Sequence, residues 1–309
     1  MNVIFMGTPD FSVPCLTKLI ERGHKISAVF TQPDKPVGRK HILTAPPVKT
    51  AALENNIPVY QPDSLKNGGA YNIIKDYKPD VIIVVAYGKI LPPEILKAAK
   101  YGCINVHASL LPKYRGASPI QQAVLNGDSE TGVTVMQMDE GIDTGDMLLV
   151  KKTEIGINET SDELFDRLSV IGAQALAECL DLLSDGSIKP VKQSGDGVSY
   201  TQKITKALSP IDWSKTAFEV HNQVRGLQTW PCAETKINGK TVKIHKTVLS
   251  AKTGNKPGVV VDNKNTLTVC CGDGKCVDIL ALQPEGKKRM DIKSFLAGNK
   301  IEILTELGM

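Results

Sequence analysis

The sequence predicts an α/β protein with a doubly wound parallel sheet, followed by a small β-barrel domain. In the first half, continuous apolar segments alternate with segments of helical periodicity, as in repeated strand–helix units. Beyond residue 205 the pattern changes to short alternating strands with turns such as Asn238-Gly239, a pair typical of hairpins. Residues 186–205 are polar and glycine-rich, as in an interdomain linker. We therefore expect three regions, 1–185, 186–205 and 206–309.

Apolar spacing and boundary residues predict the individual elements. Strands are expected at 2–7, 25–30, around 59, and at 81–86, 103–107, 131–138 and 147–155. Helices are expected at 12–22, from 46–47 onward, at 70–77, after 92–93, at 119–126 and at 161–184; Gly23 and Gly127 end two of them. In the second domain, a helix over 212–227 precedes a barrel of roughly five strands.

Composition limits the classes of function. The chain has 309 residues, of which 41% are hydrophobic and 23% charged, as in an ordinary globular enzyme. The apolar segments are too short to cross a bilayer and no targeting segment precedes the first strand, so we expect a cytoplasmic location. The seven cysteines lack the spacing of metal ligands, and no metal site is predicted. The default expectation is a monomer.

Charge is distributed unevenly along the chain. Residues 1–205 contain 21 Lys and Arg against 23 Asp and Glu, a net charge of −2, whereas residues 206–309 contain 16 against 10, a net charge of +6. This asymmetry suggests that the second half binds a polyanion. The segment 31–46 is also cationic and unusually long for a strand–helix connection. A solvated excursion and a contact with nucleic acid both fit its composition.

Side chains suited to catalysis gather just after the strand at 103–107. Asn105 and His107 end that strand, and ligands of open α/β sheets bind beyond the C-terminal ends of strands. An amide and an imidazole there indicate acyl or proton chemistry. Downstream, the acidic turn 139–146 lacks the order of calcium ligands in an EF-hand, and its Asp143 is expected to point inward.

Each of these residues also has a structural alternative. Asn105 could cap the next turn, His107 could be a buried structural histidine, and Asp143 could serve only the turn. A nicotinamide oxidoreductase is disfavoured, because the turn at 7–12 lacks the glycine fingerprint of dinucleotide-binding folds.

Six segments match one known family in order and in spacing. They are MGTPDFS, TQPDKPVGR, VVAYGKILP, CINVHASLLPKYRGASPI, GVTVMQMDEGIDTGDML and LQPEGKKRM. Together they closely resemble the methionyl-tRNA formyltransferase family over essentially the whole chain. The resemblance implies a Rossmann-like catalytic domain at 1–185 and an OB-like, tRNA-binding barrel at 206–309. It also implies transfer of a formyl group from 10-formyltetrahydrofolate to the α-amino group of methionyl initiator tRNA, for translation initiation.

The resemblance assigns roles to residues by position. It implies that Asn105, His107 and Asp143 are catalytic. The folate-binding segment falls on Ser109, Leu110, Leu111 and Pro112, and the arginine that engages the acceptor end of tRNA falls on Arg39. From their charge, Lys35, Lys40, Lys287, Lys288 and Arg289 are also expected to contact tRNA. Lys113 and Arg115 could meet either the folate tail or a tRNA phosphate.

The expected reaction needs groups of these types. The Asn105 amide would donate to the developing oxyanion, His107 would donate to the same oxygen or move a proton, and Asp143 would orient the imidazole. Two rival functions remain open at this point. One is a formyltransferase that acts on a ribonucleotide or sugar amine, and the other is a non-catalytic RNA-binding protein with a degenerate folate domain.

Overall fold

The computed structural model describes residues 1–38 and 41–308, which divide into two compact units. The first unit contains Met1–Gly116, Thr131–Thr153 and Phe165–Tyr200. The second contains Ala117–Glu130, Glu154–Leu164 and the chain from Thr201 onward. Two of the expected tRNA-binding residues, Arg39 and Lys40, lie outside the described residues.

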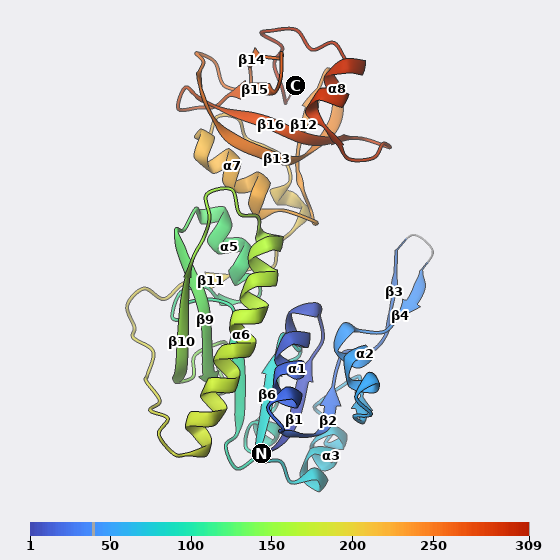
Figure 1. Cartoon of the computed structure of the whole chain (residues 1–309), viewed down its shortest axis with the longest axis vertical. Coiled ribbons are helices and arrows are strands. Elements are labelled where there is room, and N and C mark those ends of the chain that lie inside the picture. Colours follow the sequence, from blue (N-terminus) through green and yellow to red (C-terminus); the bar gives the residue numbers. More distant parts are fainter. Residues whose placement is uncertain (39–40, 309) are drawn as a thin grey trace. The chain divides into compact units, whose positions relative to one another are not determined.

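A seven-stranded sheet organises the first unit, in the order β10-β9-β7-β6-β1-β2-β5 (Figure 1). Its strands are β1 (Asn2–Gly7), β2 (Lys25–Phe30), β5 (Val59–Tyr60), β6 (Val81–Val85), β7 (Cys103–His107), β9 (Glu130–Gln137) and β10 (Met147–Glu154). The pairs joining β5, β2, β1, β6 and β7 are parallel, as the sequence predicts. β9 runs antiparallel to β7, so the sheet is only mostly parallel.

The reversal at β9 has a topological cause. A parallel connection needs a crossover that packs on the sheet and returns to its starting edge. The only helix between β7 and β9 is the short α5 (Pro119–Asn126), which belongs to the second unit and packs there against α7 (Ala217–Gly226). Without such a crossover, the chain re-enters the sheet in the opposite direction.

Helices cover the two faces of this sheet. On one face, α3 (Gly69–Tyr77) and α4 (Pro93–Leu96) bury Ile4, Met6 and Cys103. The other face carries η1 (Asp10–Ser12), α1 (Val13–Glu21), α2 (Pro47–Glu54) and the part of α6 (Ser161–Ser184) that belongs to this unit. There the Phe11 and Phe165 rings pack edge to face with centroids 5.2 Å apart.

The long cationic segment is not a plain loop. It contains a two-stranded antiparallel hairpin of β3 (Lys35–Val37) and β4 (Ile42–Thr44), which extends from the rest of the unit in Figure 1. At its base, the Lys49 ammonium forms an ion pair with the Asp34 carboxylate at 2.8 Å. The sequence predicts only a loop here, because each strand has three residues and all six residues are exposed.

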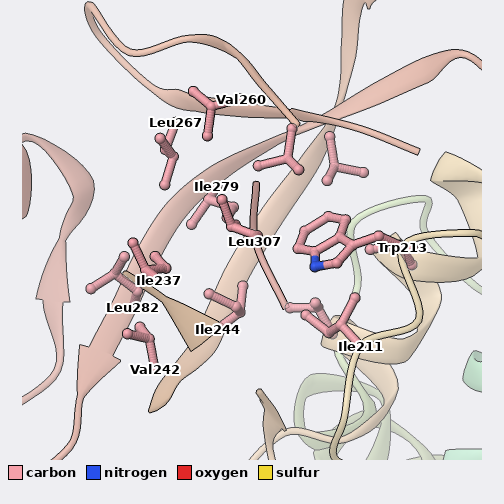
Figure 2. Close-up of a cluster of buried hydrophobic side chains, with 14 of the residues drawn as sticks. Ile211, Trp213, Ile237, Val242, Ile244, Val260, Leu267, Ile279, Leu282 and Leu307 are labelled. Atoms are coloured by element: carbon pink, nitrogen blue, oxygen red, sulfur yellow. The ribbon is translucent and has the colours of Figure 1, made fainter. Parts of the chain in front are cut away.

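The second unit is built on an antiparallel sheet. Its strands run in the order β12-β13-β16-β15-β14, with β17 also paired to β16 (Figure 1). Their bounds are β12 (Ala233–Ile237), β13 (Lys240–Thr253), β14 (Val260–Asp262), β15 (Leu267–Cys270), β16 (Lys275–Pro284) and β17 (Met290–Asp291). Figure 2 shows the core inside this sheet, where Trp213 lies among Ile244, Ile279 and Leu307.

Helix α7 is shorter than predicted. The expected helix over 212–227 begins only at Ala217, because Thr216 and Glu219 form a reciprocal capping box at that point. The preceding Asp212 instead accepts the backbone N–H of Ser214 at 3.0 Å, as in a turn. The remaining elements are η2 (Lys206–Leu208), α8 (Ile292–Gly298) and the short pair of β8 (Arg115–Gly116) with β11 (Tyr200–Thr201).

Among the helices of residues 1–38 and 41–308, none has both the length and the apolar character to cross a bilayer.

Candidate active site

The candidate site begins at the C-terminal end of β7. Side chains alternate between the faces of a strand, so Asn105 and His107 project on the same side as Cys103, toward α3 and α4. The Asn105 side chain is half-buried, and its carboxamide has no hydrogen-bond partner within residues 1–38 and 41–308. Its N–H groups are therefore available to a bound molecule.

His107 lies between two oxygen acceptors. Its Nδ1 is 3.6 Å from Oδ2 of Asp143, and its Nε2 is 3.0 Å from the backbone carbonyl of Tyr114. The histidine side chain is 6% exposed and the Asp143 side chain 17%. The structure thus brings together the imidazole and the carboxylate, although 36 residues separate them in the sequence.

The Asp143 backbone adopts a conformation that is uncommon for a residue with a side chain. Its φ is 52°, in the left-handed region. In that conformation its carboxylate accepts the backbone N–H of Gly116 at 2.8 Å. Gly145 allows the same turn to close, because a Cβ there would lie 1.8 Å from the carbonyl oxygen of Gln137. The acidic turn is therefore shaped by close backbone contacts.

The expected folate-binding segment is held to β9 by a buried hydroxyl. Thr134 Oγ1 donates to the Ser109 carbonyl at 2.7 Å and accepts the Leu111 N–H at 3.2 Å. The Ser109 hydroxyl in turn donates to the Lys113 carbonyl at 2.6 Å. Thr134 is not among the residues predicted from the sequence. It is identified only by the pairing of β7 with β9, which sets it opposite His107.

Arg115, whose role the sequence left open, points into the protein. The residue is 8% exposed, and its Nη2 and Nε donate to Oε1 of Gln193 at 2.7 and 3.1 Å. Its Nη1 lies 3.3 Å from the Tyr200 hydroxyl. Gln193 is a second contributor that the sequence pattern does not reveal, because it stands in a polar segment that is typical of a linker.

The expected tRNA-binding residues that are described are all exposed. Lys35 lies on the β3–β4 hairpin of the first unit. Lys287, Lys288 and Arg289 form the turn between β16 and β17 in the second unit. None of them is near the β7 end in sequence.

Two family models match the chain. The formyl transferase model matches residues 1–180, and the formyl transferase C-terminal domain model matches residues 203–300. A methionyl-tRNA formyltransferase of Alkaliphilus oremlandii is 47% identical over 303 residues, which are 98% of each chain. The corresponding protein of Lachnospira eligens is 48% identical over the full length of both chains. The chain belongs to the methionyl-tRNA formyltransferase family.

Solved structures agree with this membership at the level of the fold. An N-formyltransferase from Helicobacter canadensis, in complex with folinic acid and dTDP-3-aminofucose, has a TM-score of 0.72 to this chain. It is 22% identical, and the match covers 91% of this chain and 98% of the other. The resemblance predicted from the six segments is therefore confirmed, as is the class of enzyme.

Proposed function

We propose that this chain transfers a formyl group from 10-formyltetrahydrofolate to the α-amino group of methionyl initiator tRNA, for translation initiation. The observation that carries the proposal is the identity of 44–48% to proteins named methionyl-tRNA formyltransferase over nearly their whole length. Asn105, His107 and Asp143, three residue types suited to formyl transfer, also converge at one end of the sheet. The folate contributes the formyl group and receives a proton as it leaves.

The Asn105 amide is the proposed donor to the oxygen that becomes an oxyanion during transfer. Its lack of a partner within the described residues supports this role, since no protein hydrogen bond has to break first. A fixed donor of this kind costs no reorganisation at the moment of reaction. Its position two residues from His107, on the same face of the strand, supports a role for both groups at one substrate position.

His107 is the proposed proton carrier, and Asp143 the residue that orients it. In a ring protonated at both positions, Nε2 can donate to the Tyr114 carbonyl, and the charged ring is attracted to the Asp143 carboxylate 3.6 Å from Nδ1. When one of those protons moves to the substrate, the Asp143 carboxylate keeps the ring in place. The groups therefore support movement of a proton from the attacking amine toward the leaving nitrogen.

The segment Ser109–Pro112 is the proposed folate-binding segment, and its chemistry fits a flat, amide-bearing ring. Leu110 and Leu111 supply apolar contact, while the backbone supplies hydrogen-bonding groups. The hydroxyls of Ser109 and Thr134 bind that backbone and hold it in one arrangement. A segment fixed before binding loses less conformational entropy when the ligand arrives.

We propose that the second unit is an OB-like barrel that binds tRNA. Its two outer strands, β12 and β14, are both bonded to the C-terminal segment. Val260 of β14 exchanges backbone hydrogen bonds with Thr305 and Leu304, each 2.9 Å long, and the Gly308 N–H donates to Lys236 of β12 at 2.9 Å. These bonds support closure of the sheet through the end of the chain.

The remaining assignments are also proposals. Arg39, Lys35 and Lys40 would contact the tRNA near its acceptor end, and Lys287, Lys288 and Arg289 would contact its phosphates. The regions 1–185, 186–205 and 206–309 would be the catalytic domain, linker and tRNA-binding domain. We further propose that the protein acts as a monomer in the cytoplasm, where initiator tRNA is charged.

A formylation assay with purified protein tests the proposed function. The protein is mixed with 10-formyltetrahydrofolate and one acceptor, either methionine-charged initiator tRNA, free methionine or an amino sugar nucleotide. We expect formyl-methionyl-tRNA to form only with the charged tRNA. A product formed only on the amino sugar nucleotide would move the proposal to small amine acceptors. No transfer to any acceptor would refute catalysis.

A further inference from the structure

We propose that Gln193, held by the buried Arg115, is a positioning residue that keeps the Asp143 carboxylate directed at His107. This inference deepens the proposed function, on which it rests for the identity of the reaction. The role falls to a residue of the segment 186–205, which in sequence resembles only a linker.

The first step of the argument is how Gln193 binds the acidic turn. Its side-chain Nε2 donates to two backbone carbonyls, those of Asp143 and Gly145, each at 2.8 Å. Asp143, which supplies the first of these carbonyls, has a φ of 52°, a conformation that non-glycine residues rarely adopt without support. The two bonds from one amide group therefore hold the backbone at Asp143 and again two residues later, at Gly145.

The second step is that Gln193 is itself held in one orientation. Its Oε1 accepts two N–H groups of the Arg115 guanidinium, at 2.7 and 3.1 Å. Arg115 is 8% exposed and stacks near the Tyr200 ring, with Cζ 5.9 Å from the ring centroid. An arginine can only donate, so it orients the amide with its oxygen inward and its N–H₂ toward the acidic turn.

The third step connects the same segment to the other side of His107. Ser199 accepts the Arg115 N–H with its carbonyl and the Tyr114 N–H with its hydroxyl, both at 2.9 Å. The Tyr114 carbonyl is the partner of His107 Nε2. Two residues further along the chain, the Gly116 N–H donates to the Asp143 carboxylate. Residues 193–199 therefore support both acceptors that face the imidazole.

These contacts predict that Gln193 affects the geometry of the catalytic groups more than it affects substrate binding. Within residues 1–38 and 41–308, the Gln193 side chain forms hydrogen bonds with Arg115 and the acidic turn and none with His107 or the expected folate-binding segment, so its effect on formyl transfer is expected to pass through Asp143. A displacement of about 1 Å in a catalytic group can cost about 10²-fold in rate. Loss of the Gln193 amide should thus lower kcat and leave the KM values for folate and tRNA nearly unchanged.

Two substitutions test this role, with a third as control. Gln193→Leu removes both functions of the amide. Gln193→Glu keeps an oxygen for Arg115 but replaces the N–H₂ donor with an oxygen that repels both carbonyls. Gln202→Leu changes an exposed glutamine of the same segment that forms no hydrogen bond within the described residues. Thermal unfolding of each variant shows whether the fold is retained.

We expect both Gln193 variants to lower kcat by roughly ten- to hundredfold, and Gln202→Leu to leave it unchanged. In an Asp143→Asn background, Gln193→Leu should change kcat by no more than about twofold, because the carboxylate through which Gln193 acts has already been removed. Full additivity of the two substitutions, or wild-type kcat in Gln193→Glu, would overturn the proposal.

A readout without turnover separates this inference from the proposed function. The chain contains five histidines, so the His107 ring nitrogens can be assigned by NMR with a His107→Ala variant. Gln193→Leu and Asp143→Asn should both change the His107 ring nitrogen chemical shifts, in the same direction. Unchanged shifts in Gln193→Leu would refute the positioning role, even if the wild-type protein formylated no acceptor tested.

Discussion

The Asn105 carboxamide offers a direct test of the site at the scale of a residue. It has no hydrogen-bond partner within the described chain, so its removal should not disturb the fold. We expect Asn105→Ala to lower kcat for formyl transfer by about 10²–10³-fold, the usual cost of losing one oxyanion donor. Steady-state kinetics checks this. Asn72→Ala, an exposed asparagine of α3, is the matched control, and a near-normal kcat for Asn105→Ala would remove Asn105 from the mechanism.

A second residue-scale prediction concerns pH and stability. His221 is buried between the Thr247 hydroxyl and the Ile157 carbonyl, each 2.9 Å from a ring nitrogen. Burial lowers its pKa below the ordinary value for histidine, which is about 6.5. As the pH falls below that value, His221 is protonated in the unfolded chain but stays neutral in the folded chain. The free energy of unfolding therefore decreases as the pH falls.

The chain allows a specific measurement of this effect. Both tryptophans, Trp213 and Trp230, belong to the second unit with His221, so their fluorescence follows unfolding of that unit. We expect denaturant unfolding to show a smaller loss of stability between pH 7.5 and 5.5 in His221→Gln than in wild type. His24 and His245, whose pKa values burial also lowers, are present in both proteins and cancel in the comparison. Equal losses would contradict the prediction.

At the scale of an element, strand β9 supports the expected folate-binding segment through Gly132. A Cβ at this position would lie 2.1 Å from the Lys151 carbonyl oxygen and 2.6 Å from a methyl carbon of Leu110. The backbone oxygen cannot move without disturbing β10, so Gly132→Ala should displace Leu110. We expect a loss of about 1–3 kcal/mol in stability and weaker folate binding, measured by thermal unfolding and calorimetry.

Gly195→Ala is the control for this prediction, because a Cβ there has open space around it. It should change the stability by less than about 0.5 kcal/mol and leave folate binding as in wild type. If Gly132→Ala destabilised the protein but bound folate normally, the proposed place of Leu110 at the folate would be wrong.

The elements also show what sequence patterns can and cannot predict. The strand–helix repeat of the first unit and the position of Asn105 and His107 at a strand end follow from local apolar spacing. Thr134 and Gln193 could not be found in that way. Gln193 meets Asp143 across 50 residues, and only the fold brings them together. The β3–β4 hairpin was missed because exposed three-residue strands carry no burial pattern.

At the scale of the whole molecule, the predicted catalytic residues and the excess of positive charge lie in different parts of the chain. The predicted catalytic groups lie in the first unit, whereas residues 206–309 carry a net charge of +6. Binding to phosphates is non-specific in sequence and strong at low salt, so a basic domain can hold a large RNA without contacting the reacting groups. Under the proposed function, recognition of the methionyl end would then fall to the first unit.

This division predicts how salt affects tRNA binding. Replacing Lys287, Lys288 and Arg289 by alanine should weaken binding and reduce the slope of log affinity against log salt by roughly two to three, about one for each lost phosphate contact. The control replaces Lys66, Lys75 and Lys97, three exposed lysines of the first unit, and removes the same charge. Filter binding of charged tRNA from 50 to about 200 mM salt measures both slopes. Equal changes in the two triple variants would mean that net charge, rather than the β16–β17 turn, governs tRNA binding.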